Sequence, residues 1–116
     1  MKKLLLVLFS LILFGCSSNY KTVNVETVYK AINDNSDVVI LDVRTLEEYN
    51  EEHIPNAVNI PIDDIDTIDI EKDKTIYVYC ASGNRSKMAT NELIDMGYTD
   101  VYNMGGINNY PYELEK

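Results

Sequence analysis

The chain has 116 residues, with 19 acidic and 10 basic side chains and a formal net charge of −9 at pH 7. A chain of this length can bury one hydrophobic core and has no room for a second domain of ordinary size. The acidic balance argues against a nucleic-acid-binding protein, because no basic stripe is present to neutralise phosphates.

Residues 1–15 are predicted to be a secretory signal peptide. Lys2 and Lys3 precede an apolar run from Leu4 to Phe14, which is shorter than the about 20 residues that a membrane-spanning helix needs. The segment Leu13-Phe14-Gly15-Cys16 resembles the lipobox of bacterial lipoproteins, which implies cleavage before Cys16 and lipidation of Cys16. We therefore expect a lipid-anchored protein on the extracytoplasmic side of the cell membrane. An uncleaved anchor or a signal peptide without lipid are the alternatives, and both would still export the protein.

The polar segment 16–21 is predicted to be a tether, and the folded domain is predicted over residues 22–116. The apolar spacing at the start of this domain predicts a helix over about residues 25–34. The run Val38-Val39-Ile40-Leu41 is typical of a strand that is buried on both faces.

The middle of the domain begins with a helix-capping signal. Thr45 and Glu48 have the spacing of a capping box, which predicts a short helix that runs to about Glu51. A second short strand is expected at 57–60. An apolar face at helical or turn spacing follows at Ile62, Ile65 and Ile68, with aspartates between these residues.

The last third of the chain alternates strand and helix signals. The β-branched and aromatic run 75–79 predicts a central strand, and apolar spacing predicts a helix over 86–96 with Gly97 as its C-terminal cap. The last strand is expected at 101–104, with Gly105-Gly106 as a turn and a short helix or turn from 107 to 110. This alternation predicts an α/β fold with a mainly parallel sheet and helices on both faces.

Cys80 lies between the predicted central strand and the helix that follows it. Backbone amides of such a loop converge on one point, and the helix N-terminus adds partial positive charge there. Both effects favour the nucleophilic thiolate form of a cysteine. If Cys16 carries lipid, Cys80 has no partner in the chain for a disulfide. It is then either a buried and inert thiol or a reactive one, and the polar loop with its glycine favours a reactive thiol.

Five motifs in register resemble the single-domain rhodanese family. They are Leu41-Asp42-Val43-Arg44, Glu48-Tyr49, the segment from His53 to Pro61, the loop from Cys80 to Ser86, and Gly97-Tyr98 with Gly105-Gly106. The resemblance implies a rhodanese-like fold with five strands, mainly parallel. It also implies a sulfurtransferase that needs no cofactor or metal and that forms a persulfide on Cys80. The sulfur donor would be a small molecule such as thiosulfate or polysulfide, and the acceptor a thiol or a cyanide-like nucleophile.

Residues around Cys80 receive predicted roles on the same basis. The amides of Ala81, Ser82, Gly83, Asn84, Arg85 and Ser86 are expected to bind the transferred sulfur. Arg85 either braces the loop through carbonyl groups or attracts an anionic donor.

Other polar residues of the motifs are expected to be structural. Asp42 is expected to accept bonds from nearby loop amides and Arg44 to pair with Glu48 or Glu47, so that both support the site. His53 is expected to be a hydrogen-bonded turn residue, since no cluster of ligands at metal spacing surrounds it.

The sequence departs from the family pattern where glycine is common, at Glu52 and Asn56, and where tryptophan is common, near Tyr110. These changes bear on the shape of the rim of the site and on the choice of acceptor.

Two other functions are considered. A cysteine phosphatase or arsenate reductase uses a loop one residue longer than the one from Cys80 to Arg85, and a shorter loop fits one sulfur atom better than a tetrahedral oxyanion. A non-catalytic sulfur-binding or interaction module is expected to lack the cysteine or the arginine.

Overall fold

Five strands form one sheet in the order β1-β5-β4-β2-β3 in the computed structural model, which describes residues 20–116. The strands are β1 (Lys21–Thr22), β2 (Val38–Asp42), β3 (Val58–Asn59), β4 (Thr75–Cys80) and β5 (Val101–Gly106). Every pairing between neighbouring strands of this sheet is parallel. Because β4 is the middle strand, its carboxyl end lies between the carboxyl ends of β2 and β5, where ligand sites of parallel sheets usually lie.

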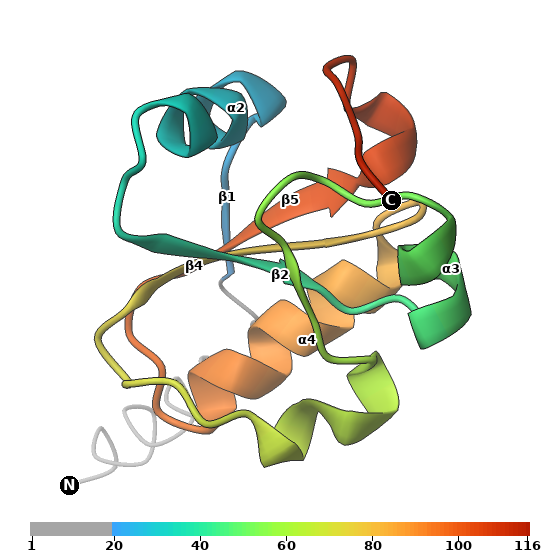
Figure 1. Ribbon diagram of the computed structural model, residues 1–116. Helices are drawn as coiled ribbons and strands as arrows, with labels where there is room; N and C mark the ends of the chain where they lie inside the picture. Colours follow the sequence, from blue (N-terminus) through green and yellow to red (C-terminus); the bar gives the residue numbers. More distant parts are fainter. Residues whose placement is uncertain (1–19) are drawn as a thin grey trace, which may run out of the picture.

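Helices cover both faces of the sheet (Figure 1). Helix α2 (Val25–Asn33) and the C-terminal segment with η2 (Ile107–Asn109) lie on one face, whereas α4 (Asn84–Asp95) and the 3₁₀ helix η1 (Ile62–Thr67) lie on the other. Helix α3 (Leu46–Glu51) follows β2 near the carboxyl edge of the sheet. The predicted α/β fold class, with a parallel five-stranded sheet and helices on both faces, is confirmed.

The alternation of side chains along β4 divides the core into two clusters. Val78 and Cys80 pack with Leu93 of α4 in one cluster, and Tyr79 packs with Val28 of α2 in the other. These five side chains are at most 1% exposed. Since successive residues of a strand point to opposite faces, the burial of Tyr79 against α2 directs Cys80 to the α4 face.

Helix ends are set by local signals. Thr45 and Glu48 form the predicted capping box of α3, in which each side chain accepts a hydrogen bond from the backbone N–H of the other residue. Gly97 follows the end of α4 with a φ of +103°, a left-handed conformation that favours glycine, as expected for a C-terminal cap.

Several predicted boundaries were wrong. Helix α4 begins at Asn84, two residues before the expected start, so the cysteine loop is shorter than predicted. Strand β5 continues through Gly105 and Gly106, which were expected to form a turn, because Gly106 pairs with Cys80 in the sheet. Strand β1 was not predicted, and it includes Lys21, which the sequence analysis placed in the tether. Lys21 belongs to a polar segment that lacks periodicity, so no strand pattern marks β1 in the sequence.

The predicted signal peptide and lipidated Cys16 lie outside residues 20–116, which the structure describes. Among those described residues, none of the helices combines the length and apolar character that a bilayer-crossing segment requires.

Candidate active site

The cysteine loop joins the carboxyl end of β4 to the first turn of α4. Gly83 is the residue before α4, and its φ of +114° lies in the left-handed region. In this conformation the Gly83 N–H donates a hydrogen bond to Cys80 Sγ at 3.0 Å. The first turn of α4 adds N–H groups that have no acceptor within the helix. The sulfur therefore lies at a helix N-terminus with one backbone donor already directed at it.

Ser86 lies behind the sulfur and is fully buried. The Cys80 S–H donates to Ser86 Oγ at 3.5 Å, and the Ser86 hydroxyl has the carbonyl oxygens of Gly83 and Gly105 as its own acceptors, at 3.0 and 3.3 Å. Cys80 itself is 1% exposed and forms no disulfide. The hydroxyl can turn from acceptor to donor when the thiol loses its proton, so the buried sulfur has polar partners in both states.

Strand β5 holds the loop backbone closely. Gly106 pairs with Cys80, and a β-carbon at Gly106 would overlap the carbonyl oxygen of Ala81 and lie 2.9 Å from Ser82 Cα. The Ala81 carbonyl also accepts a hydrogen bond from the Asn108 N–H at 3.2 Å. The sequence analysis named Gly106 as part of a motif but gave it no role at the site.

Gly106→Ala is expected to displace the cysteine loop, because the overlap is with backbone atoms that cannot rotate away. Overpacking of this kind costs about 1–3 kcal/mol. Urea unfolding measures the loss, and the rate of Cys80 alkylation by iodoacetamide reports the altered loop. Gly105→Ala is the control for backbone strain alone, since a β-carbon there meets no atom within 4 Å although φ is +102°. An alkylation rate and stability equal to the parent's would contradict the prediction.

Arg85 forms a two-pronged ion pair with Glu48 of α3. Arg85 Nη1 lies 2.8 Å from Glu48 Oε1 and Nη2 lies 3.1 Å from Oε2. Backbone carbonyls or an anionic donor were the predicted partners of Arg85. In the structure its guanidinium binds a carboxylate, and binding of a donor stays a prediction. Glu48 was expected among the partners of Arg44, which was wrong because Arg44 pairs with Asp42 at 2.7 Å.

The Arg85 guanidinium lowers the pKa of the Glu48 carboxyl from an ordinary value of 4.5 to about 2. A carboxyl whose pKa is lowered in the folded state stabilises the fold above its unfolded-state pKa, and this contribution is lost as the pH falls through the folded-state pKa. The stability difference between the parent and Glu48→Gln is therefore expected to shrink as the pH falls from about 4.5 to 2. Urea unfolding at a series of pH values measures it. Glu47→Gln, which removes an adjacent exposed carboxylate, is the control, and a constant difference for Glu48→Gln would contradict the prediction.

Asp42 and Arg44 form a buried charge pair beneath the loop. Asp42 is 0% exposed and accepts from Arg44 Nε, from Arg44 Nη2 and from the backbone N–H of Arg44. Tyr79, the residue before Cys80, donates its hydroxyl to Asp42 Oδ2 at 2.7 Å and accepts from the Ile54 N–H at 3.1 Å. Burial raises the pKa of the Tyr79 hydroxyl. No local sequence pattern identifies Asp42 as the partner of the Tyr79 hydroxyl, because the two residues are 37 positions apart in the chain.

The departures from the family pattern are accommodated in the backbone. Asn56 has a φ of +70°, a left-handed conformation that asparagine tolerates better than most residues. Glu52 has a φ of −172°, which is ordinary extended backbone, and its carbonyl accepts from Arg44 Nη2 at 2.8 Å. Tyr110, near the position where tryptophan is common, is 7% exposed and belongs to the core cluster that contains Val28 of α2.

His53 makes structural contacts with α3 and with the C-terminal segment. Its Nδ1 is 2.8 Å from the carbonyl oxygen of Tyr49, and its ring stacks on the Tyr49 ring. Its backbone pairs with Glu115 of the C-terminal segment. Within residues 20–116 no group of three or more histidine, cysteine or acidic side chains is placed to hold a metal ion.

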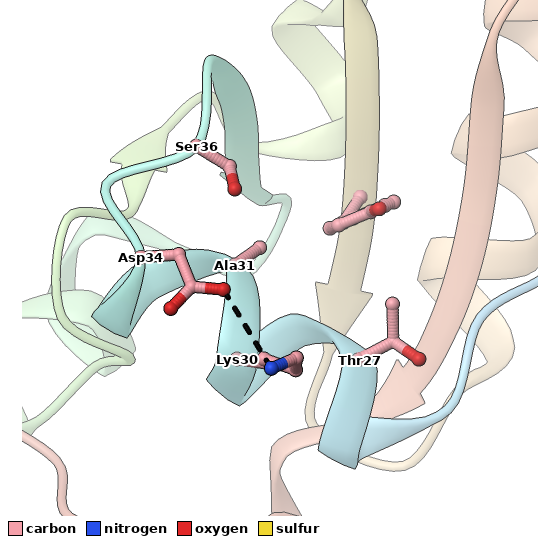
Figure 2. A pocket seen from close by; sticks show the side chains of 6 residues that line it. Thr27, Lys30, Ala31, Asp34 and Ser36 are labelled. Atoms are coloured by element: carbon pink, nitrogen blue, oxygen red, sulfur yellow. Dashed lines mark ion pairs between the residues drawn. The ribbon is translucent and has the colours of Figure 1, made fainter.

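A shallow pocket of about 230 Å³ lies elsewhere, between α2 and β4. Figure 2 shows Lys30 and Asp34 of this pocket facing each other, and their side chains form an ion pair at 3.8 Å. Thr27, Ala31, Ser36 and Tyr77 complete the lining. None of these residues belongs to the cysteine loop, and the sequence analysis predicted no site here.

Comparisons with known proteins agree on one kind of domain. The sequence pattern described as a rhodanese-like domain matches residues 24–111. The thiosulfate sulfurtransferase PspE of Escherichia coli is 41% identical over 71 residues, which are 58% of this chain and 68% of PspE. The adenylyltransferase and sulfurtransferase UBA4 of Meyerozyma guilliermondii is 39% identical over 93 residues, or 71% of this chain, but the chain spans only 22% of UBA4.

A solved structure also resembles this chain. The crystal structure of a rhodanese-related protein from Thermoplasma volcanium superimposes with a TM-score of 0.71 at 34% sequence identity. The match covers 82% of this chain and 97% of that protein. The likeness therefore extends over nearly the whole of that solved chain.

Proposed function

The chain belongs to the rhodanese-like domain family, and from this we propose that it is a sulfurtransferase that carries sulfane sulfur as a persulfide on Cys80. The observation that carries the proposal is the hydrogen bond from the Gly83 N–H to Cys80 Sγ at the N-terminus of α4. A backbone donor and a helix N-terminus both stabilise negative charge, first on the thiolate and then on the outer sulfur of a persulfide. PspE, which is named a thiosulfate sulfurtransferase, supports thiosulfate as one donor.

The proposed reaction has two displacement steps. The Cys80 thiolate attacks the sulfane sulfur of thiosulfate, an S–S bond forms, and sulfite leaves with the electron pair of the broken S–S bond. The product is a Cys80 persulfide anion. An acceptor such as cyanide then attacks the outer sulfur, leaves as thiocyanate, and returns the electron pair to the Cys80 thiolate. No net oxidation or reduction occurs at the protein, and no cofactor is needed.

The cysteine phosphatase or arsenate reductase alternative is less well supported. Such chemistry requires a cation that binds the oxyanion, and the guanidinium of Arg85 already binds both oxygens of Glu48. The loop is also compact, because Gly106 approaches the Ala81 carbonyl so closely that no β-carbon would fit. A single sulfur atom needs less room than a tetrahedral oxyanion. These contacts support sulfur transfer over oxyanion chemistry.

Intact-mass measurement tests the proposal. The reduced protein is incubated with thiosulfate, desalted and weighed before and after addition of cyanide. We expect a gain of one sulfur atom that cyanide removes, and peptide mapping should place it on Cys80. Polysulfide is tested as a second donor. Absence of any sulfur gain from either donor would overturn the proposal and favour a non-catalytic sulfur-binding or interaction module.

We further propose that the protein is attached to the extracytoplasmic side of the cell membrane by lipid on Cys16. The lipobox-like segment before Cys16 supports this, as does the net charge of −9, which gives the domain no electrostatic attraction to anionic lipids. Cys16→Ser is expected to shift the protein from the membrane to the soluble fraction or to leave it unprocessed. Fractionation and intact mass measure both effects. Normal cleavage with unchanged membrane retention would contradict the proposal.

A further inference from the structure

Arg85 is the cation of the cysteine loop, and its charge is already paired. The segment from Cys80 to Ser86 contains no other basic residue. Both terminal nitrogens of Arg85 bind the two oxygens of Glu48, and the side chains of the two residues are 34% and 32% exposed. The pair therefore lies at the surface next to the loop. Because a carboxylate is bound to the Arg85 guanidinium, its charge creates no net positive potential at the surface of the loop.

Glu48 is held in this position by its own helix. Its Oε1 accepts from the Thr45 N–H at 2.9 Å and from the Thr45 hydroxyl at 3.1 Å, in addition to the bond from Arg85. These bonds keep the carboxylate in the capping box of α3. The bond from Arg85 lowers the pKa of Glu48 to about 2, so the carboxylate is ionised near neutral pH. Its bonds to Thr45 and Arg85 hold the carboxylate and its charge beside the Arg85 guanidinium.

Other cations near the loop do not replace Arg85. Arg44 is 5% exposed and bound to Asp42. Lys87 is exposed, and its ammonium lies over the Tyr20 ring, 5.7 Å from the ring centroid. An exposed ammonium on a long flexible stem is screened by water and salt. Among the described residues, no strong unpaired cation at the loop is therefore available to bind a doubly charged donor.

We propose that Glu48 is a specificity-determining residue, which withholds the charge of Arg85 from the donor and so favours donors with one negative charge over doubly charged thiosulfate. This rests on the proposed sulfur transfer through Cys80 and deepens it by ranking the donors, with thiosulfonate-like donors preferred to thiosulfate. Thiosulfate and thiosulfonates give the same persulfide on Cys80. From thiosulfate the leaving group is sulfite, and from methanethiosulfonate it is methanesulfinate, each of which takes the electron pair of the broken S–S bond.

Thiosulfate and methanethiosulfonate form a matched pair of probes. They differ by the replacement of one charged oxygen with a methyl group, so they have similar size and differ by one charge. The full chain is purified in detergent, and kcat/KM is measured for each donor with cyanide as acceptor. Glu48→Gln is expected to raise the ratio of kcat/KM for thiosulfate to that for methanethiosulfonate by about 5-fold, since a freed unit charge attracts the dianion more strongly.

Two controls identify the cause of that change. Glu47→Gln removes an equal charge from the neighbouring exposed residue and is expected to leave the donor ratio within about 2-fold of the parent's. Arg85→Gln is expected to lower the ratio, because it leaves the Glu48 carboxylate unpaired. The double variant Glu48→Gln with Arg85→Gln again has no net charge at this point, and its ratio is expected to return to the parent's.

The double variant separates this proposal from direct donor binding by Arg85. If Arg85 leaves Glu48 and binds the donor, the double variant keeps the low ratio of Arg85→Gln, and the proposal is overturned. An unchanged ratio in Glu48→Gln, or an equal change in Glu47→Gln, would overturn it too. If the parent loads sulfur from neither donor, the proposed function itself fails. If the parent loads sulfur but the variants leave the ratio of kcat/KM for the two donors unaltered, only the role of Glu48 fails.

The variant Glu48→Gln is expected to fold, because glutamine also serves in a capping box.

The unmodified protein provides a second test that needs no variant. If Glu48 withholds the charge of Arg85 from the donor, kcat/KM for thiosulfate should not fall as the salt concentration rises from about 20 to about 200 mM. Salt slows the association of a dianion that the site attracts, but not that of a dianion that the site repels. A steep fall with salt would overturn the proposal.

Discussion

Cys80→Ser is expected to fold like the parent and to lose sulfur transfer by at least about 1,000-fold, because a serine hydroxyl forms no persulfide. The fold should tolerate the change. The serine hydroxyl has the Gly83 N–H and Ser86 Oγ within reach, at the positions where they contact Cys80 Sγ at 3.0 and 3.5 Å. A satisfied buried hydroxyl costs about 1 kcal/mol or less. Thermal unfolding, intact mass after thiosulfate and thiocyanate release measure stability, loading and turnover.

The matched control for this variant is the other cysteine. The chain contains two cysteines, Cys16 and Cys80. Cys16→Ser is expected to gain and release sulfur like the parent, because Cys16 is not part of the proposed site. Sulfur uptake by Cys80→Ser that cyanide reverses would show that the transferred sulfur is carried elsewhere, and the assignment of Cys80 would then be wrong.

Arg44→Met is expected to destabilise the fold by about 3–5 kcal/mol, because it leaves the buried charge of Asp42 without its partner. Asp42 is 0% exposed and receives three of its side-chain bonds from the Arg44 guanidinium, at 2.7 to 3.2 Å. Methionine retains much of the side-chain volume, so the loss reports charge rather than a cavity. Urea unfolding at neutral pH measures it.

The double variant Asp42→Asn with Arg44→Met is the control for this prediction. It removes both charges, and the asparagine side-chain oxygen can still accept the Tyr79 hydroxyl bond. Replacement of a whole buried pair costs less than removal of one partner, so the double variant is expected to be more stable than Arg44→Met. Equal stability of Arg44→Met and the parent within about 1 kcal/mol would contradict the prediction.

Short-range signals in the sequence predicted much of this fold. Thr45 and Glu48 are three residues apart, and their spacing predicted the capping box that the structure contains. Alternating strand and helix patterns predicted the parallel sheet, because each pattern depends on residues that are neighbours in the chain. The position of Cys80 at the carboxyl end of a strand that leads into α4 followed from the same patterns. The sequence alone therefore determined the fold class and the cysteine loop that defines the candidate site.

Contacts between distant residues were decided only by the tertiary structure. Arg85 and Glu48 are 37 residues apart, as are Tyr79 and Asp42, and no local pattern states which arginine pairs with which carboxylate. Sequence reasoning accordingly offered Glu48 or Glu47 as the partner of Arg44, which pairs instead with Asp42. Gly106 is similar, since its need to lack a side chain arises from the Ala81 carbonyl of another strand's loop. Such pairings depend on the register and approach of elements in the folded sheet, which the order of residues along one segment does not specify.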